Sequence, residues 1–288
     1  MPNPELNMPI KRLSDAQLAH FDTEYVTPLL WKNLTKRIDA DFPSGDFRFL
    51  DVGGGSGRFT DRLLAAYPQA RGTILDNSSL LLGRNKPHAR KHLIEDSAEH
   101  MHRFDRRYDL VFFNWVLHHL VGDGYRDSLA HIDHALRAAT GLLTPRGRIS
   151  VFENIYDGLI VGNAPSHIIF GLTSARAIAP LIHRLGANTA RVGVCFQSKA
   201  GWQRILSNAG IDSLDYEADS RKHVPWTWRA FLHVGELRCG MFWGTSMLNA
   251  AGGLVRPAPI LAAARMRSTQ RVRLPGVELN ARMQRHPG

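Results

Sequence analysis

Five short apolar segments recur along the first half of the chain, separated by stretches with helical periodicity. They are FRFLDV (47–52), GTILD (72–76), HLIED (92–96), YDLVFFN (108–114) and RISVFE (148–153). Segments this short, continuous and rich in β-branched or aromatic residues are typical of strands buried on both faces of a parallel sheet. Between the last two segments, apolar residues at spacings of three and four predict a helix with one apolar face, formed by Leu129, Ile132, Leu136, Ala139 and Leu143. The alternation predicts an α/β fold with a doubly wound, Rossmann-like sheet.

The flanking sequence adds helices at both ends of this pattern. Ser14-Asp-Ala-Gln17 is a capping-box pattern that predicts a helix carrying Leu18, Phe21 and Tyr25 on one face. Thr27-Pro28 interrupts that run, and a second helix is expected over 29–38. Later, Ser198 is a candidate cap for a helix over 199–209, and strand-like segments follow at 211–217 and 238–246. These two bring the expected sheet to seven strands.

We therefore expect three regions along the chain. Residues 1–44 would form an N-terminal helical cap, and 45–253 the main domain with a cap insertion at about 154–197. Residues 254–288 hold seven Arg, one Glu and four of the fifteen Pro, a composition that predicts a basic, poorly ordered tail. That tail accounts for +6 of the formal net charge of +10, so the main domain is only mildly basic and its charge does not by itself indicate a nucleic-acid partner.

Composition narrows the class of protein. The chain has 288 residues, of which 44% are hydrophobic and 22% charged, as in globular domains. Cys195 and Cys239 cannot form a disulfide framework and fit a reducing compartment, and no signal segment is evident, so we expect a cytoplasmic protein. The apolar stretch 164–185 contains Arg176, Pro180 and two histidines, which predicts buried helix and no membrane span.

The strongest motif is Asp51-Val-Gly53-Gly-Gly55-Ser-Gly57, which joins the first strand to a helix starting near Arg58. Glycines allow a tight turn and a close approach to a ligand, and the helix N-terminus offers unpaired N–H groups, so a nucleotide-like cofactor is expected here. A dinucleotide fingerprint requires glycine where Arg58 stands, which disfavours that cofactor.

With this motif the chain resembles the class I S-adenosylmethionine (SAM) dependent methyltransferases of small-molecule type. The resemblance covers about residues 45–250 and rests on an ordered set: LDVGGGSG, Asp76 closing the second strand, Glu95-Asp96-Ser97 closing the third, Asn114 in FFNWVLHHL, and LLTPRGRISVFE. It implies SAM as the cofactor and methyl transfer as the reaction.

The resemblance also assigns roles to residues of the motifs. Asp51, Gly53, Gly55 and Gly57 would line the amino-acid end of the cofactor, Asp76 would bind the ribose hydroxyls, and Asp96 with Ser97 would face the adenine. Asn77 and Asn114 are expected among the cofactor-binding residues. A carboxylate at a strand end accepts two hydroxyl hydrogen bonds readily, although Asp76-Asn-Ser-Ser is also the chemistry of a helix N-cap.

His118 and Glu153 are the candidate catalytic residues. The resemblance places a general base after the fourth strand and an orienting acid after the fifth, and an imidazole has a pKa suited to taking the acceptor's proton. The alternative is that His118 only packs or contacts the cofactor, since the sulfonium already activates the methyl group and positioning supplies much of the acceleration. His119 is expected to point toward packing.

The acceptor is expected to be a small organic molecule, such as a specialised (secondary) metabolite, with an O-, C- or N-nucleophile. By the resemblance, residues 154–197 and 14–38 would cover it, with Tyr25 as a candidate lid. An apolar lining is expected from the insertion, namely from Ile155, Tyr156, Ile168, Ile169, Phe170 and Phe196, with ordinary core packing as the alternative.

Three other readings stay open. The pairs His88/His92 and His131/His134 have helical spacing, but neither has a convincing third ligand, so no metal site is predicted. An RNA methyltransferase is possible, although Asn114-Trp-Val-Leu117 is unlike the Asn/Asp-Pro-Pro-aromatic motif of base-amino methylating enzymes. The last reading is a SAM-binding protein without methyl-transfer activity. The sequence does not indicate an oligomeric state.

Overall fold

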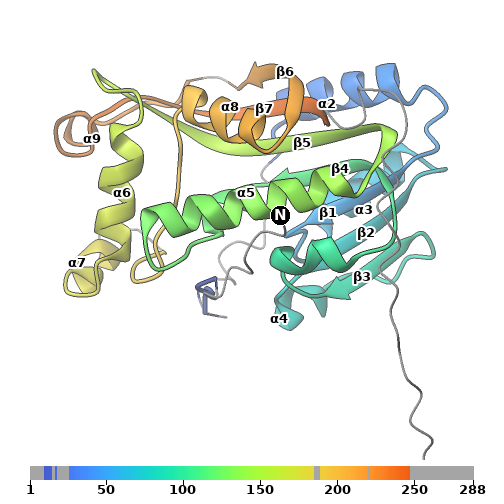
Figure 1. The fold of residues 1–288 in the computed structure, drawn as a ribbon, viewed down its shortest axis with the longest axis horizontal. Coiled ribbons are helices and arrows are strands. Elements are labelled where there is room, and N and C mark those ends of the chain that lie inside the picture. The colour runs from blue at the N-terminus through green and yellow to red at the C-terminus, as the bar shows by residue number, and fades with distance from the viewer. Residues whose placement is uncertain (1–9, 15–16, 18–25, 185–188, 220, 247–288) are drawn as a thin grey trace, which may run out of the picture. The chain divides into compact units, whose positions relative to one another are not determined.

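The computed structural model describes residues 10–14, 17, 26–184, 189–219 and 221–246 (Figure 1). The chain divides into two units, Met1–Gly253 and Leu254–Gly288. All described residues belong to the first unit. Leu18, Phe21, Tyr25 and the Arg-rich segment 254–288 lie outside the described residues, so the expectations about them stay predictions.

One seven-stranded sheet organises the described chain. Its strands are β1 (Arg48–Val52), β2 (Arg71–Asp76), β3 (Lys91–Glu95), β4 (Tyr108–Asn114), β5 (Leu143–Gly158), β6 (Ile211–Ala218) and β7 (Val234–Ser246). They lie in the order β3-β2-β1-β4-β5-β7-β6, with the first five parallel and β7 antiparallel to both of its neighbours. The predicted Rossmann-like, doubly wound α/β fold with seven strands is confirmed.

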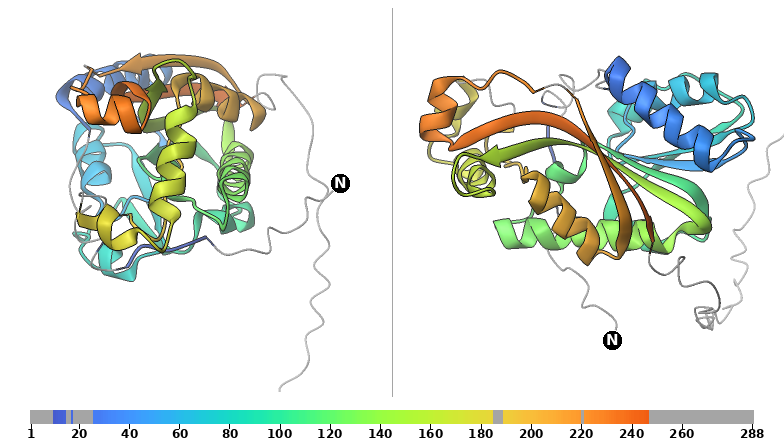
Figure 2. Two further views of the ribbon diagram at one scale, coloured as in Figure 1. Left: turned by 90° about the vertical axis from the view of Figure 1, so that its left-hand side faces the viewer. Right: turned by 90° about the horizontal axis from the view of Figure 1, so that it is seen from above.

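Helices cover both faces of the sheet. They are α2 (Pro28–Asp41), α3 (Arg58–Ala66), α4 (Ser79–Leu82), α5 (Tyr125–Gly141), α6 (Ala164–Ser174), α7 (Ala179–Arg184), α8 (Lys199–Asn208) and α9 (Trp226–Phe231), with 3-10 turns at Ala98–Arg103 and Leu117–His119. The apolar sides of α2 and α3 pack with Phe49 and Phe112 on one face, while α5 and α8 pack with Val111 and Phe113 on the other. Figure 2 shows these two helical layers on opposite sides of the strands.

Local sequence signals fix several helix starts. The Thr27 hydroxyl accepts a hydrogen bond from the Leu30 N–H at 3.3 Å, so the Thr-Pro pair that interrupts the first run is the start of α2. Ser198 caps α8 through the Gly201 N–H at 3.0 Å, as predicted. The capping box is present as well, because the Ser14 N–H donates to the Gln17 side-chain oxygen at 3.0 Å.

Strand β5 is longer than the sequence pattern indicates. Its parallel pairing with β4 ends at Phe152 opposite Asn114, but its antiparallel pairing with β7 continues to Gly158 opposite Val234. Residues 153–158 and 234–240 therefore form a two-stranded extension of the sheet, which we call the arm. The cap insertion, expected from residue 154, thus begins with strand, and its first helix is α6.

The apolar residues of the insertion pack into the protein interior. Ile155 and Phe170 belong to the core that contains α5, and Tyr156, Ile169 and Phe196 form a smaller cluster with side chains of the arm and of the segment before α9. Of the six residues expected to line an acceptor site, these five pack in the core, and none of the six, Ile168 included, lines the pocket described below.

The longest apolar stretch is divided between α6 and α7. Within the described ranges, no helix has both the length and the apolar character needed to cross a bilayer.

Phe112 offers a test of this packing. Its ring lies 5.9 Å from that of Phe49 and 5.1 Å from that of Phe59, and it is fully buried. Phe112→Ala should lower the free energy of unfolding by about 3–5 kcal/mol, because it leaves a cavity at the junction of sheet and α3. Urea unfolding measures this, with Leu93→Ala as the control, since Leu93 on the edge strand β3 is 39% exposed. Equal losses for the two variants would contradict this account of the core.

Candidate functional site

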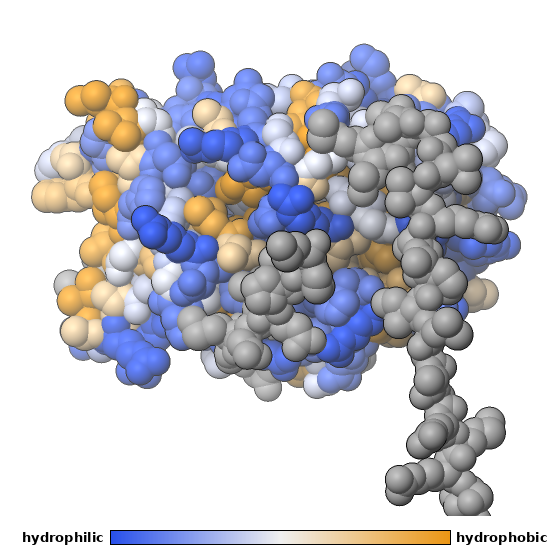
Figure 3. Space-filling view, viewed as in Figure 1, coloured by the Kyte–Doolittle hydropathy of each residue, from blue (hydrophilic) through white to orange (hydrophobic). Residues whose placement is uncertain are grey.

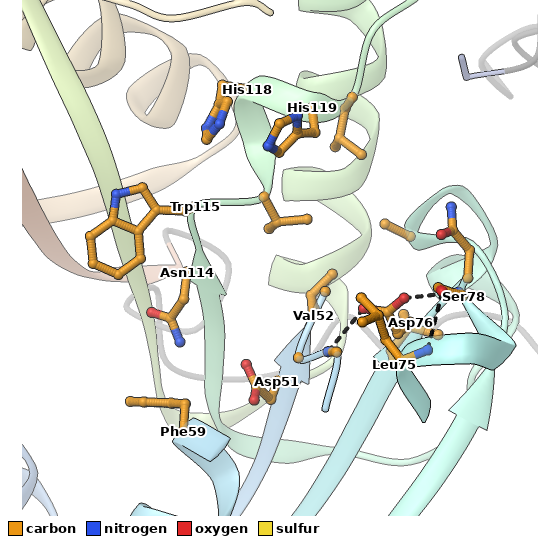
Figure 4. A pocket seen from close by; sticks show the side chains of 18 of the residues that line it. Asp51, Val52, Phe59, Leu75, Asp76, Ser78, Asn114, Trp115, His118 and His119 are labelled. Carbon is orange, nitrogen blue, oxygen red and sulfur yellow. Dashed lines mark hydrogen bonds between the residues drawn. The ribbon is translucent and has the colours of Figure 1, made fainter. Parts of the chain in front are cut away.

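A pocket of about 620 Å³ opens at the carboxyl ends of β1, β2 and β4 (Figure 4). This is where the strand order reverses, because the chain leaves β1 toward β2 on one side and reaches β4 on the other. Of the predicted site residues, the pocket is lined by Asp51, Gly53, Gly55, Asp76, Asn77, Asp96, Ser97, Asn114 and His118.

The glycine-rich loop forms the floor of the pocket. Gly53, Gly55 and Gly57 have φ of 71°, 51° and 77°, in the left-handed region that favours glycine. A Cβ atom on Gly53 would lie 2.5 Å from a methyl carbon of Val116. Gly57 does not line the pocket; it is the N-cap residue of α3, directly behind the loop.

Asp76 holds the loop from the end of β2. Its Oδ2 accepts the Gly55 N–H at 2.9 Å and its Oδ1 accepts the Ser78 N–H at 2.8 Å (Figure 4). Burial raises the pKa of this carboxyl above its usual value. The N-cap of α4 is Ser78, whose hydroxyl accepts the Leu81 N–H, so the alternative of Asp76 as the cap residue does not hold.

Asp51 lies at the back of the pocket and is 1% exposed. The Thr60 hydroxyl donates to its Oδ2 at 2.8 Å, but burial raises the pKa of Asp51 to about 7, and the nearby Asp76 carboxyl adds to this. The Asn114 side chain extends toward Asp51 in Figure 4, and within the described structure neither its amide nitrogen nor its oxygen has a hydrogen-bond partner. Such an amide is suited to binding a polar ligand.

Asp96 and Ser97 form the wall after β3. Asp96 accepts the Ser97 N–H at 2.7 Å, and its Oδ1 lies 2.5 Å from Nδ1 of His100. Although burial opposes it, these hydrogen bonds hold the pKa of Asp96 below its usual value. The Asp96 carboxyl group therefore stays ionised, whereas burial favours the neutral forms of Asp51 and Asp76.

His118 and Glu153 form a buried pair at the far wall of the pocket. The chain turns at Trp115, whose φ is 52°, into the 3-10 turn Leu117–His119. Nδ1 of His118 lies 2.6 Å from Oε2 of Glu153, and Oε1 of Glu153 accepts the Leu117 N–H at 3.0 Å. The ring of Phe196 stacks against the imidazole at 4.5 Å and fixes its orientation.

The pairing was predicted, but its setting differs from the prediction. Glu153 lies within β5 and not after it, opposite Gly240 of β7 and one residue past the last pairing with β4. It does not line the pocket, so it reaches the pocket only through His118. Burial lowers the pKa of His118 to about 3 and raises that of Glu153 well above its usual value, so the imidazole is neutral at physiological pH.

His119 also differs from expectation. It lines the pocket beside His118, with the two rings 4.1 Å apart, where packing away from the pocket was expected. The left-handed backbone at Trp115 redirects the chain just before this turn, and the turn then presents both imidazoles to the pocket. Burial and the neighbouring His118 hold the pKa of His119 well below its usual value.

Sequence reasoning missed the side of the pocket farthest from the glycine loop. That side is lined by Ile10, Lys11, Arg12, Leu13, Trp115, Asn154, Asp219, Lys222 and Cys239. The thiol of Cys239 lies 3.3 Å from the Asn154 side-chain oxygen, across the β5–β7 pair. No local motif marks Asn154 and Cys239, since they meet only through pairing between segments 85 residues apart. Among the described residues, no group of three His, Cys, Asp or Glu side chains is arranged to hold a metal ion.

Comparison with known families decides between the cofactor types that such a pocket could serve. Residues 50–149 match the model of a family described as a methyltransferase domain. The chain carries a class I S-adenosylmethionine-dependent methyltransferase domain. The match covers the glycine loop, Asp76, Asp96, Asn114 and His118, and it ends shortly before Glu153.

Two curated relatives are similar to part of this chain. A ubiquinone/menaquinone biosynthesis C-methyltransferase from Bartonella tribocorum is 31% identical over 132 residues, which is 43% of this chain and 47% of the relative. An N-terminal Xaa-Pro-Lys N-methyltransferase from Danio rerio is 31% identical over 157 residues, which is 50% of this chain and 60% of the relative. The matched region thus spans about half the length of these relatives.

Solved structures share the fold at low sequence identity. The [4+2]-cyclase SpnF has a TM-score of 0.51 and 14% identity, with 76% of this chain and 82% of that chain covered. A phosphoethanolamine N-methyltransferase from Haemonchus contortus has a TM-score of 0.51 and 12% identity, with 80% of this chain and 56% of that chain covered. At these identities the likeness concerns the fold alone.

The Gly53 contact gives a test of the loop. Gly53→Ala should lower the free energy of unfolding by about 1–3 kcal/mol, because alanine is strained at this φ and its Cβ collides with Val116. Gly53→Ala combined with Val116→Ala should recover part of the loss, because it removes the Val116 methyl groups but keeps the Cβ atom, which would lie 2.9 Å from the new one. Urea unfolding measures both, with Gly141→Ala as the control, since a Cβ there meets nothing within 4 Å. The explanation is wrong if the second substitution recovers nothing.

Proposed function

We propose that this chain transfers a methyl group from SAM to a small organic acceptor, of the specialised-metabolite kind, with an O-, C- or N-nucleophile. The observation that carries the proposal is that the glycine loop and His118 open on one pocket from opposite sides. A cofactor cradled by the loop and an acceptor beside the imidazole would be held next to each other. Free, buried Cys195 and Cys239 support a reducing, cytoplasmic setting.

The residues present fit SAM. Glycines 53 and 55 leave room where a side chain would fill the cradle, and the buried Asn114 amide offers a donor and an acceptor to a polar ligand. Asp51 and Asn114 would hold the amino-acid end, Asp76 and Asn77 the ribose, and Asp96 with Ser97 the adenine. When bound, the sulfonium of SAM supplies a methyl group that is already activated for displacement.

Asp76 can serve the ribose while still holding the loop. Each carboxylate oxygen has two lone pairs, and each accepts one backbone N–H here, so each keeps capacity for one hydroxyl. The raised pKa values of Asp51 and Asp76 support a cationic ligand such as SAM, because a cation bound beside these two carboxyl groups would favour their ionised forms.

The buried pair has two protonation forms that differ in function. With Glu153 ionised, Nδ1 of His118 keeps its proton and Nε2 offers a lone pair, so His118 is a base toward the acceptor. With Glu153 protonated, Nδ1 accepts that proton in a hydrogen bond and Nε2 carries one, so His118 is a donor. The N–H groups of Leu117 and His118 favour the ionised form, whereas burial favours the neutral one.

The cofactor assignment is tested by measuring SAM binding. Asp76→Ala should weaken SAM binding at least about tenfold in calorimetry, because the ribose loses its acceptor and the N–H groups of Gly55 and Ser78 lose theirs. Asp105→Ala, on an exposed loop, is the control.

Incubating the wild type with isotope-labelled SAM and a metabolite extract should yield a labelled small molecule by mass spectrometry. Binding without any labelled product would instead indicate a SAM-binding protein that does not transfer methyl groups, and labelled RNA would indicate the RNA-methylating alternative.

The base role is tested by pH. Because the pKa of Glu153 is raised, the base form of the pair increases as pH rises, so kcat/KM should climb with pH through a midpoint above the usual range of a carboxyl group. His118→Ala should reduce turnover at least about tenfold, within the ~10²–10⁴ typical of a general base, while SAM affinity is kept. Glu153→Gln should remove the pH dependence, and exposed His102→Ala should change nothing. Unchanged turnover in His118→Ala would leave positioning alone as the source of rate.

A further inference from the structure

An exposed apolar surface lies at the tip of the arm, away from the pocket. It is formed by the loop after β5 and by α9: Leu159 (48% exposed), Ile160 (90%), Val161 (62%), Trp226 (73%), Trp228 (38%) and Phe231 (72%). We call these six residues the tip patch. Exposed side chains of this size add up to several hundred Å² of apolar surface, which is at the upper end for a protein surface that has no partner.

The two segments are joined at the tip. The Leu159 N–H donates to the His233 carbonyl at 3.0 Å, and β5 and β7 end opposite each other at Gly158 and Val234. Figure 1 and the right-hand view of Figure 2 both place α9 and the loop at one end of the described structure, and Figure 3 shows apolar side chains gathered there. A short loop and a helix of six residues present a projecting surface and not a groove.

We propose that the tip patch docks the protein on an anionic membrane surface. Ile160 is almost entirely in solvent at the end of a loop without charged residues, which suits insertion among acyl chains. The indole rings of Trp226 and Trp228 are the side chains that favour the boundary between headgroups and hydrocarbon.

The charges beside the tip patch favour anionic lipid over a neutral partner. Residues 221–235 contain three basic residues and no Asp or Glu; Lys222 lines the pocket, which leaves Arg221 and Arg229 beside the tip patch. Arg221 pairs with Glu236 at 2.9 Å, whereas the Arg229 guanidinium, on α9 itself, donates to the Gly235 carbonyl and faces no carboxylate among the described residues. Basic side chains beside inserted aromatic rings contact phosphate groups of lipid headgroups.

This docking is independent of the proposed function, but it bears on it through the arm. Lys222 lines the pocket and lies four residues before Trp226, and Cys239 and Asn154 line the pocket at the base of the arm. The far side of the pocket is thus connected to the tip patch by a few residues of rigid strand.

Vesicle binding tests the proposal with the full chain. Ile160→Ser, Trp226→Ser and Phe231→Ser together should lower partitioning onto vesicles of phosphatidylcholine with one-third phosphatidylglycerol by about tenfold or more, because three exposed apolar side chains no longer enter the bilayer. Leu93→Ser, which removes an exposed leucine from the opposite edge of the sheet, should have no effect. Every variant keeps the arginines of 254–288, so electrostatic binding by that segment is equal throughout. Unchanged SAM binding and urea midpoints show that the triple variant is folded.

A second variant separates insertion from surface attraction. Trp226→Phe with Trp228→Phe keeps the apolar surface and should partition as the wild type does, but it should lose the quenching of tryptophan fluorescence by lipids with brominated acyl chains. Equal partitioning of the wild type and the triple variant overturns the proposal, and so does quenching that survives in the double variant. Wild-type dimers in sedimentation velocity that the triple variant abolishes, without vesicle binding, would make the tip patch a protein interface instead.

Discussion

Three buried carboxylates hold the loops at the carboxyl edge of the sheet. Asp51 accepts the Thr60 hydroxyl from α3, Asp76 accepts N–H groups of the glycine loop and of Ser78, and Glu153 accepts N–H groups from the turn after β4. A buried carboxylate without such donors costs several kcal/mol, so each loop is confined to conformations that supply them. The shape of the pocket follows from this constraint more than from any apolar contact.

The same constraint sets the electrostatics of the pocket. Burial raises the pKa of all three carboxyls, and the nearby Asp76 carboxyl raises that of Asp51 further. In the folded state Asp51 binds a proton up to a pH of about 7, which the unfolded chain releases at lower pH. Its contribution to stability therefore falls as pH rises through that window. A positively charged ligand beside Asp51 offsets this loss, which is a physical reason for a cationic cofactor at this edge.

Most of the sheet could be predicted because its signals are local. The first four parallel strands are short segments with an apolar centre, of which β2, β3 and β4 end at a polar residue, and the glycine loop is a contiguous motif whose φ values only glycine adopts readily. Asp51, Asp76, Asp96 and His118 follow from these, since the carboxyl ends of neighbouring parallel strands must meet at one edge.

What could not be predicted depends on pairing between distant segments. The antiparallel register of β5 with β7 extends β5 to Gly158, puts Glu153 inside a strand, and brings Lys222 and Cys239 to the pocket. The spacing of apolar residues within 154–197 does not indicate how β5 pairs with β7. The apolar residues of that segment are therefore equally consistent with a pocket lining and with core packing. The turn after Trp115 is likewise not encoded in a spacing, because it depends on a left-handed φ at a residue other than glycine.

The arm shows how one strand pair serves two environments. At its base, Glu153 and Asn154 lie beside Gly240 and Cys239, where the neighbouring β4 ends and leaves room for the pocket. At its tip, β5 and β7 have no further neighbour from the parallel half of the sheet, and the connecting segments on either side carry the tip patch. Backbone pairing is indifferent to side chains, so the same ladder holds the buried Glu153 carboxyl group at one end and adjoins the exposed tryptophans of α9 at the other. The continuous ladder between β5 and β7 sets the spacing between pocket and tip through backbone hydrogen bonds alone, so the arm is the element that would position a membrane bound at the tip relative to an acceptor in the pocket.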